Sequence, residues 1–177
     1  MFKRKCVWGG YRFGNTQVTR PYMDLLDTRN AEKIFLNLKT IWDNIDVIVV
    51  EGEQTRMGVG NDLLSNAKSI KRILAPSENA YDKYNDILEA IRKHYHGGLV
   101  LIALGPTATV LAGELAENNI WALDVGHIDI EYEWYRQKAK GKVAIPGKYV
   151  NEAGIEGRTV SECDDFEYLR QIEERLY

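Results

Sequence analysis

The chain has 177 residues, a length that fits one domain with a substantial hydrophobic core. Hydrophobic residues make up 45% of it and charged residues 28%, which is typical of a globular protein and excludes wholesale disorder. The formal net charge of -3 gives no general attraction to nucleic acid or to anionic membranes, so we expect no nucleic-acid partner. Any phosphate binding must come from a local site.

The chain carries two cysteines, Cys6 and Cys163, which are too few for a disulfide framework and lack a metal-site spacing. We therefore expect a reducing compartment and a cytoplasmic protein. The longest strongly apolar run, residues 99–104, is far too short to span a bilayer, so we expect no transmembrane segment. The basic residues 3–5 are not followed by an apolar stretch and do not form a signal peptide.

Apolar residues recur at helical or strand spacing along most of the chain. Runs of β-branched residues that are apolar on both faces are typical of buried parallel strands. The sequence predicts, in chain order, a helix over 30–44, strands over 46–50 and 69–75, a helix over 81–95, a strand over 99–104, a helix over 106–118, a strand over 120–125 and helices over 130–140 and 164–176.

The alternation of strands and helices predicts the fold class. It is typical of a mainly parallel sheet joined by right-handed crossovers, with helices on both faces. We therefore expect residues 1–177 to form a single Rossmann-like α/β domain. The last helix is predicted because Phe166, Leu169, Ile172 and Leu176 would share one face. Ligands in such folds bind beyond the carboxyl ends of the strands, and three polar loops begin there.

The first of these loops follows the strongest predicted strand and opens the next helix. Glycine lets a ligand approach the backbone closely. The unpaired amide groups of the first helical turn and the helix dipole attract anions, and two threonine hydroxyls add donors. The alternative is a capped helix that binds nothing. We assign phosphate binding to Gly105, Pro106, Thr107, Ala108 and Thr109.

The second loop follows the strand over 46–50 and is rich in glycine and charge. Glu51 and Glu53 are one residue apart, so they can share a divalent cation such as magnesium or manganese. A planar guanidinium in the same loop suits a phosphate, and its glycines permit tight or left-handed backbone. The alternative is a polar loop whose charges are simply solvated. The candidate ligand-binding residues are Arg56, Gly58, Gly60 and Asn61.

The third loop, residues 124–134, combines four carboxylates with one of the three histidines. His127 is a candidate general base, metal ligand or phosphate donor, and a structural role for it is equally open. Asp129 and Glu131 are candidates for binding a metal or for activating an acceptor hydroxyl as the base. A helix start enriched in acids for dipole reasons is the alternative. In a fourth segment Lys148 is a candidate phosphate ligand, although a plain loop is the simpler interpretation.

Several long segments, in order, resemble the GT-D-type glycosyltransferases, which are bacterial enzymes encoded in gene clusters for capsule synthesis and adhesin glycosylation. The resemblance implies a Rossmann-like fold, a UDP-sugar donor such as UDP-glucose and a divalent metal, manganese or magnesium. It also implies transfer of the sugar to a cell-surface glycan or glycoprotein. It is carried by residues 49–63, 66–70, 103–112, 124–134 and 147–152, together with Gly14-Asn15 and Arg20-Pro21-Tyr22.

One segment of the family has no counterpart in this sequence. In the family, a Gly-Asp-Gly-Glu segment upstream of the matched part supplies a metal-binding Asp-x-Glu. Glu51-Gly52-Glu53 looks similar but matches a different segment, so the resemblance does not give it that role. Loss of the metal ligands would impair a metal-dependent transfer, and an exposed sheet edge would favour a homodimer. We therefore expect an N-terminally truncated product, a natural remnant or half of a split protein.

The leading hypothesis is a metal-dependent glycosyltransferase, or its nucleotide-binding part, that transfers a hexose, expected to be glucose. The donor diphosphate would lie at residues 105–109, with Arg56 and Lys148 assisting. The alternative is a non-catalytic subunit or remnant that binds a nucleotide or a partner protein. A third hypothesis is another Rossmann-like transferase, which would bind S-adenosylmethionine instead of UDP.

Overall fold

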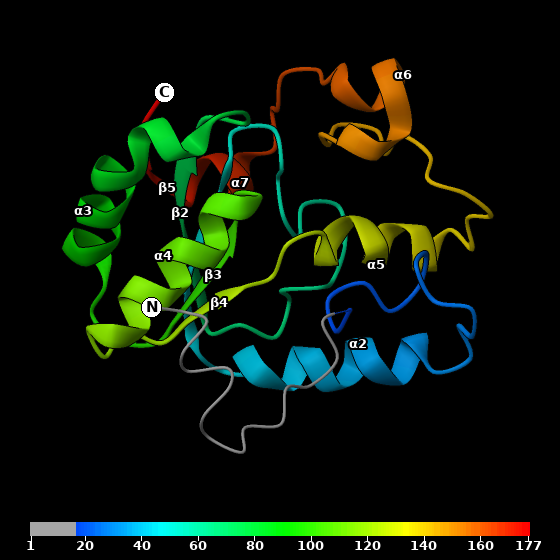
Figure 1. The fold of residues 1–177 in the computed structure, drawn as a ribbon, viewed down its shortest axis with the longest axis horizontal. Helices are drawn as coiled ribbons and strands as arrows, with labels where there is room; N and C mark the ends of the chain where they lie inside the picture. Colours follow the sequence, from blue (N-terminus) through cyan, green and yellow to red (C-terminus); the bar gives the residue numbers. More distant parts are fainter. Residues whose placement is uncertain (1–16) are drawn as a thin grey trace, which may run out of the picture.

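The computed structural model describes residues 17–177, which form a five-stranded parallel sheet with helices on both faces (Figure 1). The strand order is β4-β3-β1-β2-β5 and every neighbouring pair is parallel. This confirms the predicted Rossmann-like α/β class. The strands are β1 (Asp46–Gly52), β2 (Ser69–Ala75), β3 (Leu99–Ala103), β4 (Ala122–Asp124) and β5 (Ile172–Arg175).

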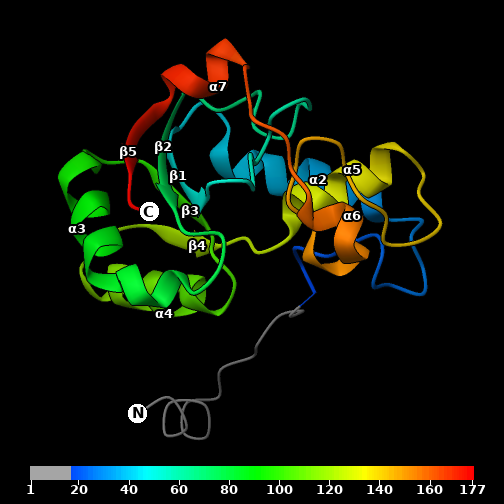
Figure 2. The same cartoon turned by 90° about the horizontal axis from the view of Figure 1, so that it is seen from above.

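The helices lie in two layers around the sheet. In the view from above, the strands lie between α3 and α4 on one side and α2 and α5 on the other (Figure 2). Short 3₁₀ turns follow α2 and precede α3 and α6. The helical elements are α2 (Ala31–Lys39), η1 (Thr40–Trp42), η2 (Ala80–Lys83), α3 (Tyr84–His94), α4 (Pro106–Glu117), α5 (Ile128–Arg136), η3 (Asn151–Ala153), α6 (Gly154–Arg158) and α7 (Phe166–Arg170).

The central strand β1 supplies both hydrophobic cores, because successive side chains of a strand point to opposite faces. Ile48 and Val50 pack in the core beneath α3 and α4. Val47 and Val49 pack in the second core with Phe35 of α2. Each of these side chains is at most 5% exposed. Burying a side chain of this size contributes about 1.5–3 kcal/mol, so β1 is fixed firmly between the two layers.

The C-terminal segment corrects the helix predicted over residues 164–176. The helix α7 ends at Arg170, and residues 172–175 form β5, which pairs with β2. Helical spacing would bury Phe166 and Leu169, yet they are 76% and 40% exposed. The backbone of β2 decides the outcome: Leu74 accepts a hydrogen bond of 2.8 Å from the amide of Leu176. Long-range strand pairing therefore overrides the local helical pattern.

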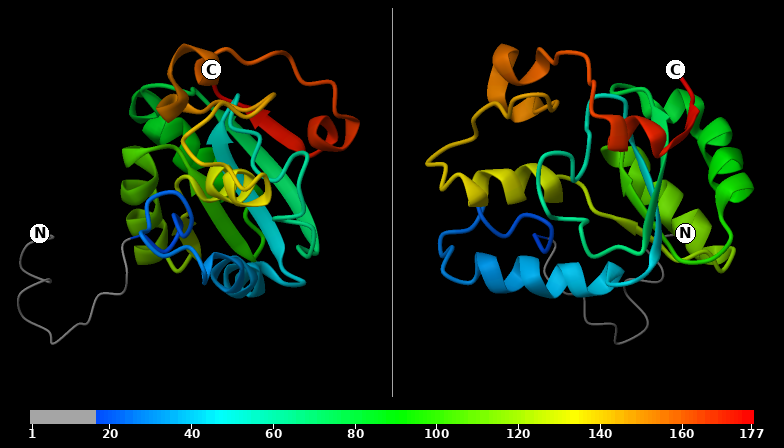
Figure 3. Two further views of the ribbon diagram at one scale, coloured as in Figure 1. Left: turned by 90° about the vertical axis from the view of Figure 1, so that its right-hand side faces the viewer. Right: turned by 180° about the vertical axis from the view of Figure 1, so that it is seen from behind.

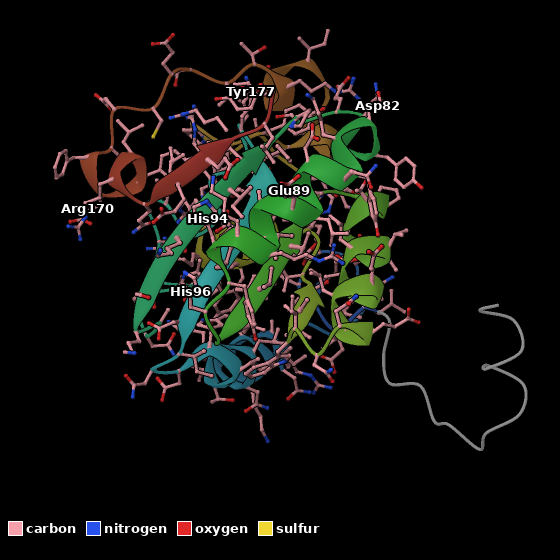
Figure 4. The ribbon with its side chains drawn as sticks, turned by 90° about the vertical axis from the view of Figure 1, so that its left-hand side faces the viewer. Asp82, Glu89, His94, His96, Arg170 and Tyr177 are labelled. Carbon is pink, nitrogen blue, oxygen red and sulfur yellow. The ribbon has the colours of Figure 1, made fainter. Side chains whose placement is uncertain are left out.

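Side chains of α3 and β5 hold this edge strand in place. His94 Nε2 and Lys93 Nζ each lie 3.0 Å from the carboxylate of Glu174. Figure 4 shows His94 on α3 beside the sheet, with Arg170 and Tyr177 at opposite ends of β5. Within residues 17–177, none of the helices is long and apolar enough to cross a membrane.

The strand order places the carboxyl ends of β1 and β3 side by side where the chain changes direction. From β1 the chain continues to β2 on one side, and from β3 it continues to β4 on the other. Open α/β sheets bind ligands in the crevice at such a point. We therefore expect a ligand site at the edge of the sheet where β1 ends at Gly52 and β3 ends at Ala103.

Candidate functional site at the carboxyl edge of the sheet

A cavity of about 150 Å³ opens at this crevice. Its floor comes from the ends of β1 and β3, and α5, which lies in front of the strands in the left-hand view of Figure 3, supplies one wall. The three polar loops singled out in the sequence meet here. The lining residues are Gly52, Thr55, Ser77, Ala103, Leu104, Gly105, Gly126, His127, Asp129, Ile130, Tyr149 and Asn151.

The turn into α4 contributes backbone to this cavity. Gly105 has φ 54° and ψ -141°, a conformation that residues with a Cβ rarely adopt. Pro106 occupies the first turn of α4, as predicted. Leu104 and Gly105 line the cavity, whereas Pro106, Thr107, Ala108 and Thr109 do not. A phosphate site at this turn stays a prediction, and Gly105 is the residue of the five that a ligand in the cavity would meet.

The two threonines of the turn have other surroundings. The Thr109 hydroxyl donates a hydrogen bond of 2.7 Å to Asp124 Oδ2 and so ties α4 to the end of β4. Thr107 is buried in the first turn of the helix. The hydroxyl of Thr109 is therefore engaged with β4 and is not presented to the cavity.

Asp129 at the start of α5 is the buried acceptor of the site. Its Oδ1 accepts hydrogen bonds of 2.9 Å from the Gly58 amide and 2.8 Å from Asn61 Nδ2. Its Oδ2 lies 2.6 Å from Lys148 Nζ. The structure thus brings together residues from three segments that the sequence analysis treated separately. Asp129 also lines the cavity, although its side chain is 3% exposed.

Lys148 is the counter-ion of a small buried charge network. Its Nζ also lies 3.6 Å from Glu133 Oε1, and Asn61 Nδ2 bridges the two carboxylates by donating to Glu133 at 2.7 Å. A buried ion pair is costly to break because one charge is left uncompensated. Lys148 therefore holds Asp129 in place and its Nζ is engaged by two carboxylates, while phosphate binding by Lys148 stays a prediction.

His127 occupies the N-cap position of α5 without a side-chain capping hydrogen bond, and it lines the cavity. Its Nε2 lies 3.0 Å from Asn151 Oδ1 and 3.9 Å from Glu152 Oε2. The side chain is 29% exposed, so a ligand can reach the imidazole. Of the three predicted catalytic residues, His127 and Asp129 line the cavity.

Glu131, the third predicted catalytic residue, lies outside the cavity. It is fully buried, and its Oε2 accepts hydrogen bonds of 3.0 Å and 2.8 Å from the amides of Tyr22 and Met23. Its Oε1 has no partner within residues 17–177. Burial raises the pKa of this carboxyl, although the two amide donors lower it in part. Glu131 anchors the segment around residue 22 against α5.

Arg56 joins two loops above the sheet. Its Nη1 donates 2.8 Å to the Gly147 carbonyl and its Nη2 donates 2.6 Å to the Ser161 carbonyl. The residue is 8% exposed and does not line the cavity at Gly105. Gly60 is also distant: it is exposed, and its carbonyl accepts 3.2 Å from Arg136. The predicted phosphate fork of Arg56 is therefore occupied by main-chain carbonyls.

Glu51 and Glu53 do not face a common space for a cation. Glu51 is fully buried, with Oε1 2.6 Å from Arg72 Nη1 and Oε2 2.6 Å from the Met57 amide. Burial raises the pKa of Glu51, while Arg72 and the amide lower it in part. Glu53 lines a different cavity. A cation shared by the two carboxylates would have to displace Arg72, and this geometry does not support one.

Comparison with known proteins identifies the family. The model of the "Glycosyltransferase GT-D fold" family matches residues 1–153. The chain belongs to the GT-D family. It is 43% identical to the "Probable glycosyl transferase Gly" of Streptococcus gordonii over 160 residues, which covers 90% of this chain and 23% of the relative. It is also 43% identical to "Glycosyltransferase GlyD" of Streptococcus pneumoniae serotype 4 (strain ATCC BAA-334 / TIGR4), over 93% of this chain and 20% of the relative.

Solved structures of similar sequence share the fold. One, described as "the highly conserved domain of unknown function 1792" with "a distinct glycosyltransferase fold", superposes with a TM-score of 0.89 at 41% identity and covers 99% of this chain and 63% of that one. A "new glycosyltransferase (DUF1792) from Streptococcus sanguinis" gives a TM-score of 0.87 at 42% identity, over 93% and 61% of the two chains. The chain thus spans about a fifth of the curated relatives and about three fifths of the solved ones.

Sequence reasoning missed several residues of this cavity. Ser77, Tyr149 and Asn151 line the cavity, but Ser77 follows a strand whose loop carried no motif. The Ser77 hydroxyl is buried and has no partner within residues 17–177. The bridge from Asn61 to Glu133 joins residues 72 positions apart, and nothing local indicates it. The Gly147–Asn151 segment was noted, but its sequence did not indicate that Lys148 pairs with Asp129.

Proposed function

We propose that this chain forms the nucleotide-sugar-binding part of a glycosyltransferase that transfers a hexose, with glucose expected, from a UDP-sugar to a cell-surface glycan or glycoprotein. Family membership supports the reaction class. The observation that carries the proposal is the cavity at the β1–β3 crevice, into which the Gly105 turn, Ser77 and His127 all open. The unpaired buried hydroxyl of Ser77 is a group that a polar ligand would satisfy.

The donor diphosphate belongs at the Gly105 end of this cavity. The helix α4 has 12 residues and begins there, so its first-turn amides and its dipole favour negative charge. A volume of about 150 Å³ holds a diphosphate or a sugar ring rather than a whole UDP-sugar. The rest of the donor therefore extends along the open edge of the sheet.

The chemistry assigned to the residues follows from where they lie. In transfer, the bond between the anomeric carbon and the phosphate oxygen breaks, the acceptor oxygen bonds to that carbon, and the acceptor proton passes to a base. His127 lines the cavity and its side chain is 29% exposed, and we assign it to hydrogen bonding with the leaving diphosphate. Asp129 is the carboxylate of the cavity wall and the candidate base, and it would have to exchange its contact with Lys148 for the acceptor hydroxyl to take up the proton.

A divalent metal would offset the charge of the leaving diphosphate. The described residues do not fit one. Asp129 is neutralised by Lys148, Glu51 by Arg72, and residues 17–177 contain no group of three or more His, Cys, Asp and Glu placed to hold a metal ion. We therefore derive no step through a metal.

The same observation favours a second candidate function, a non-catalytic nucleotide-binding subunit. The two functions differ in turnover. Both predict that UDP raises the melting temperature, by an amount equivalent to about 2.7 kcal/mol at a hundred times its Kd. Release of UDP from UDP-glucose in the presence of manganese supports the transferase, and binding without release supports the subunit. Stabilisation by S-adenosylmethionine instead of UDP would contradict both.

His127 gives the site its direct test. His127→Ala should abolish the UDP-induced shift while leaving the melting temperature of the free protein almost unchanged. The matched control is His96→Ala, because His96 is an exposed histidine near the end of α3 (Figure 4) and lies away from the cavity. Equal UDP shifts in both variants would place the ligand elsewhere. A cytoplasmic location and a homodimer through an edge strand stay predictions, which fractionation and light scattering can check.

A further inference from the structure

A second, larger cavity lies on the other side of the turn that follows β1. Its volume is about 380 Å³, within the range of about 300–1,000 Å³ common for small-molecule sites. The turn itself separates the two cavities: Gly52 and Thr55 line the first, whereas Glu53, Gln54 and Arg56 line the second. The other walls come from residues 160–163, from α7 and from the end of β5.

A buried donor in this wall lacks a partner. Arg56 uses both Nη atoms on the carbonyls of Gly147 and Ser161, but its Nε has no hydrogen-bond partner in the described part of the chain. Arg56 is buried, with 8% of its surface exposed, and it forms no ion pair within residues 17–177. An unpaired buried donor costs free energy. A ligand in this cavity that offers an oxygen acceptor to Arg56 Nε would remove that cost.

The wall of this cavity carries two arginines and two glutamates, and within residues 17–177 no ion pair joins any of the four. Arg175 donates 2.7 Å to the Tyr177 hydroxyl, and neither Arg175, Glu53 nor Glu162 forms an ion pair in the described region. The two arginines disfavour a cationic ligand, and the two carboxylates disfavour an anionic one. Neutral hydroxyl groups, which both donate and accept, suit such a mixture.

An aromatic face completes the cavity. Tyr177 is 55% exposed and Arg175 holds its hydroxyl, so one face of the ring is available. Tyr168 also lines the cavity and is buried, with the Arg72 guanidinium 4.9 Å from its ring centroid. Rings of this kind supply apolar contact area with a polar edge. The C–H face of a pyranose with hydroxyls around its rim matches both features.

We propose that this second cavity binds a neutral saccharide unit. Naming this unit the acceptor rests on the proposed function; the binding site itself does not. The two cavities share one wall, because the Gln54 carbonyl accepts 2.9 Å from the Tyr149 amide, and Tyr149 lines the first cavity. A ligand in the second cavity therefore lies next to the donor edge.

The test is a titration of the whole chain with methyl β-glucoside or N-acetylglucosamine, up to about 50 mM, followed by NMR of the arginine Nε–H groups and tyrosine rings. We expect shifts at Arg56, Arg175 and Tyr177. Arg175→Ala and Tyr177→Ala should each weaken binding at least about tenfold. Arg170→Ala is the control, because Arg170 is an exposed arginine at the opposite end of β5 and pairs with Glu167 (Figure 4).

Two results would overturn the saccharide site. One is the absence of shifts at these residues with either sugar. The other is a response to inorganic phosphate alone, which would mark an anion site. A parallel UDP titration keeps the two proposals apart: failure of UDP to perturb Gly105 in the unmodified chain counts against the donor site, whatever the sugars do at Arg175.

Discussion

Lys148 Nζ lies 2.6 Å from Asp129 Oδ2, and both side chains are at most 4% exposed. The sequence places these residues on different loops, and each was expected to meet a ligand. The structure shows that they meet each other beneath the cavity. Because both groups are buried, removing either charge would leave the other uncompensated and would destabilise the site.

Lys148→Met should therefore destabilise the fold strongly, by about 3–5 kcal/mol, because Asp129 and Glu133 lose their cation. Urea unfolding measures the loss. Lys142→Met is the matched control: Lys142 pairs with Asp24 and Glu152 but is 32% exposed, so its loss should cost less than about 1 kcal/mol. Adding Asp129→Asn to Lys148→Met should recover part of the stability, and equal costs for the two lysines would refute the buried pair.

Gly105→Ala should weaken UDP binding and lower stability by about 1–3 kcal/mol, because the residue sits at φ 54° and ψ -141°. A Cβ at this position would meet no atom within 4 Å, so backbone strain alone is the cause. Gly113→Ala in α4 is the control, and a helical alanine there should add up to about 1 kcal/mol. Losses of the same size at both glycines would contradict the assignment.

The Glu131 carboxyl should make the free energy of unfolding fall as the pH rises. Because burial raises the pKa of Glu131 in the folded chain, its favourable contribution is fully present below its ordinary pKa of 4.5 and is lost as pH rises through the folded value. Glu131→Gln keeps an acceptor for the Tyr22 and Met23 amides without the charge. The variant should match the parent in acid and exceed its stability at neutral pH, as measured by urea unfolding across that range.

Glu174 supplies the control of opposite sign. Hydrogen bonds from Lys93 and His94 lower the pKa of Glu174, so its contribution is present above its ordinary pKa of 4.5 and is lost as pH falls through the folded value. Glu174→Gln should therefore cost a little stability at neutral pH and none in strong acid. If Glu131→Gln gave the same profile as Glu174→Gln, Glu131 would not be a desolvated carboxyl.

Arg56→Ala should loosen the segment over the sheet. Loss of the bonds to Gly147 and Ser161 leaves two carbonyls without their donor, a cost of about 1–3 kcal/mol each when buried. Hydrogen exchange at the Tyr149 amide, which donates to Gln54, should accelerate markedly. Arg92→Ala is the control, because it removes an exposed pair with Glu114 and should leave the exchange rate of the Tyr149 amide unchanged. Equal exchange rates of this amide in the two variants would contradict the role of Arg56 in holding the segment.

The sequence predicted β1 and β3 well because runs such as Val47 to Val50 are apolar on both faces, a pattern that requires no knowledge of partners. It also predicted that the loops after these strands would share one edge. It could not find β5, whose residues 172–175 include three charged side chains and become a strand through pairing with β2, about a hundred positions earlier.

The same limit applies to the site. Residue type indicated that His127 and Asp129 would face the cavity, and both do. Residue type could not distinguish an arginine that binds a phosphate from one that holds carbonyls, and both Nη atoms of Arg56 donate to main-chain carbonyls. Contacts such as Glu51 with Arg72 depend on the register of neighbouring strands, which is a property of the assembled sheet.

The position of β5 at the edge of the sheet has a consequence for synthesis. Because β5 follows β2 by about a hundred residues, β2 keeps an open edge on the ribosome until residues 172–175 have emerged. Unpaired strand edges on nascent chains invite pairing with other chains. β5 thus covers the edge of β2 only late in the synthesis of this segment, and chaperone contact during translation should concentrate on the exposed side of β2.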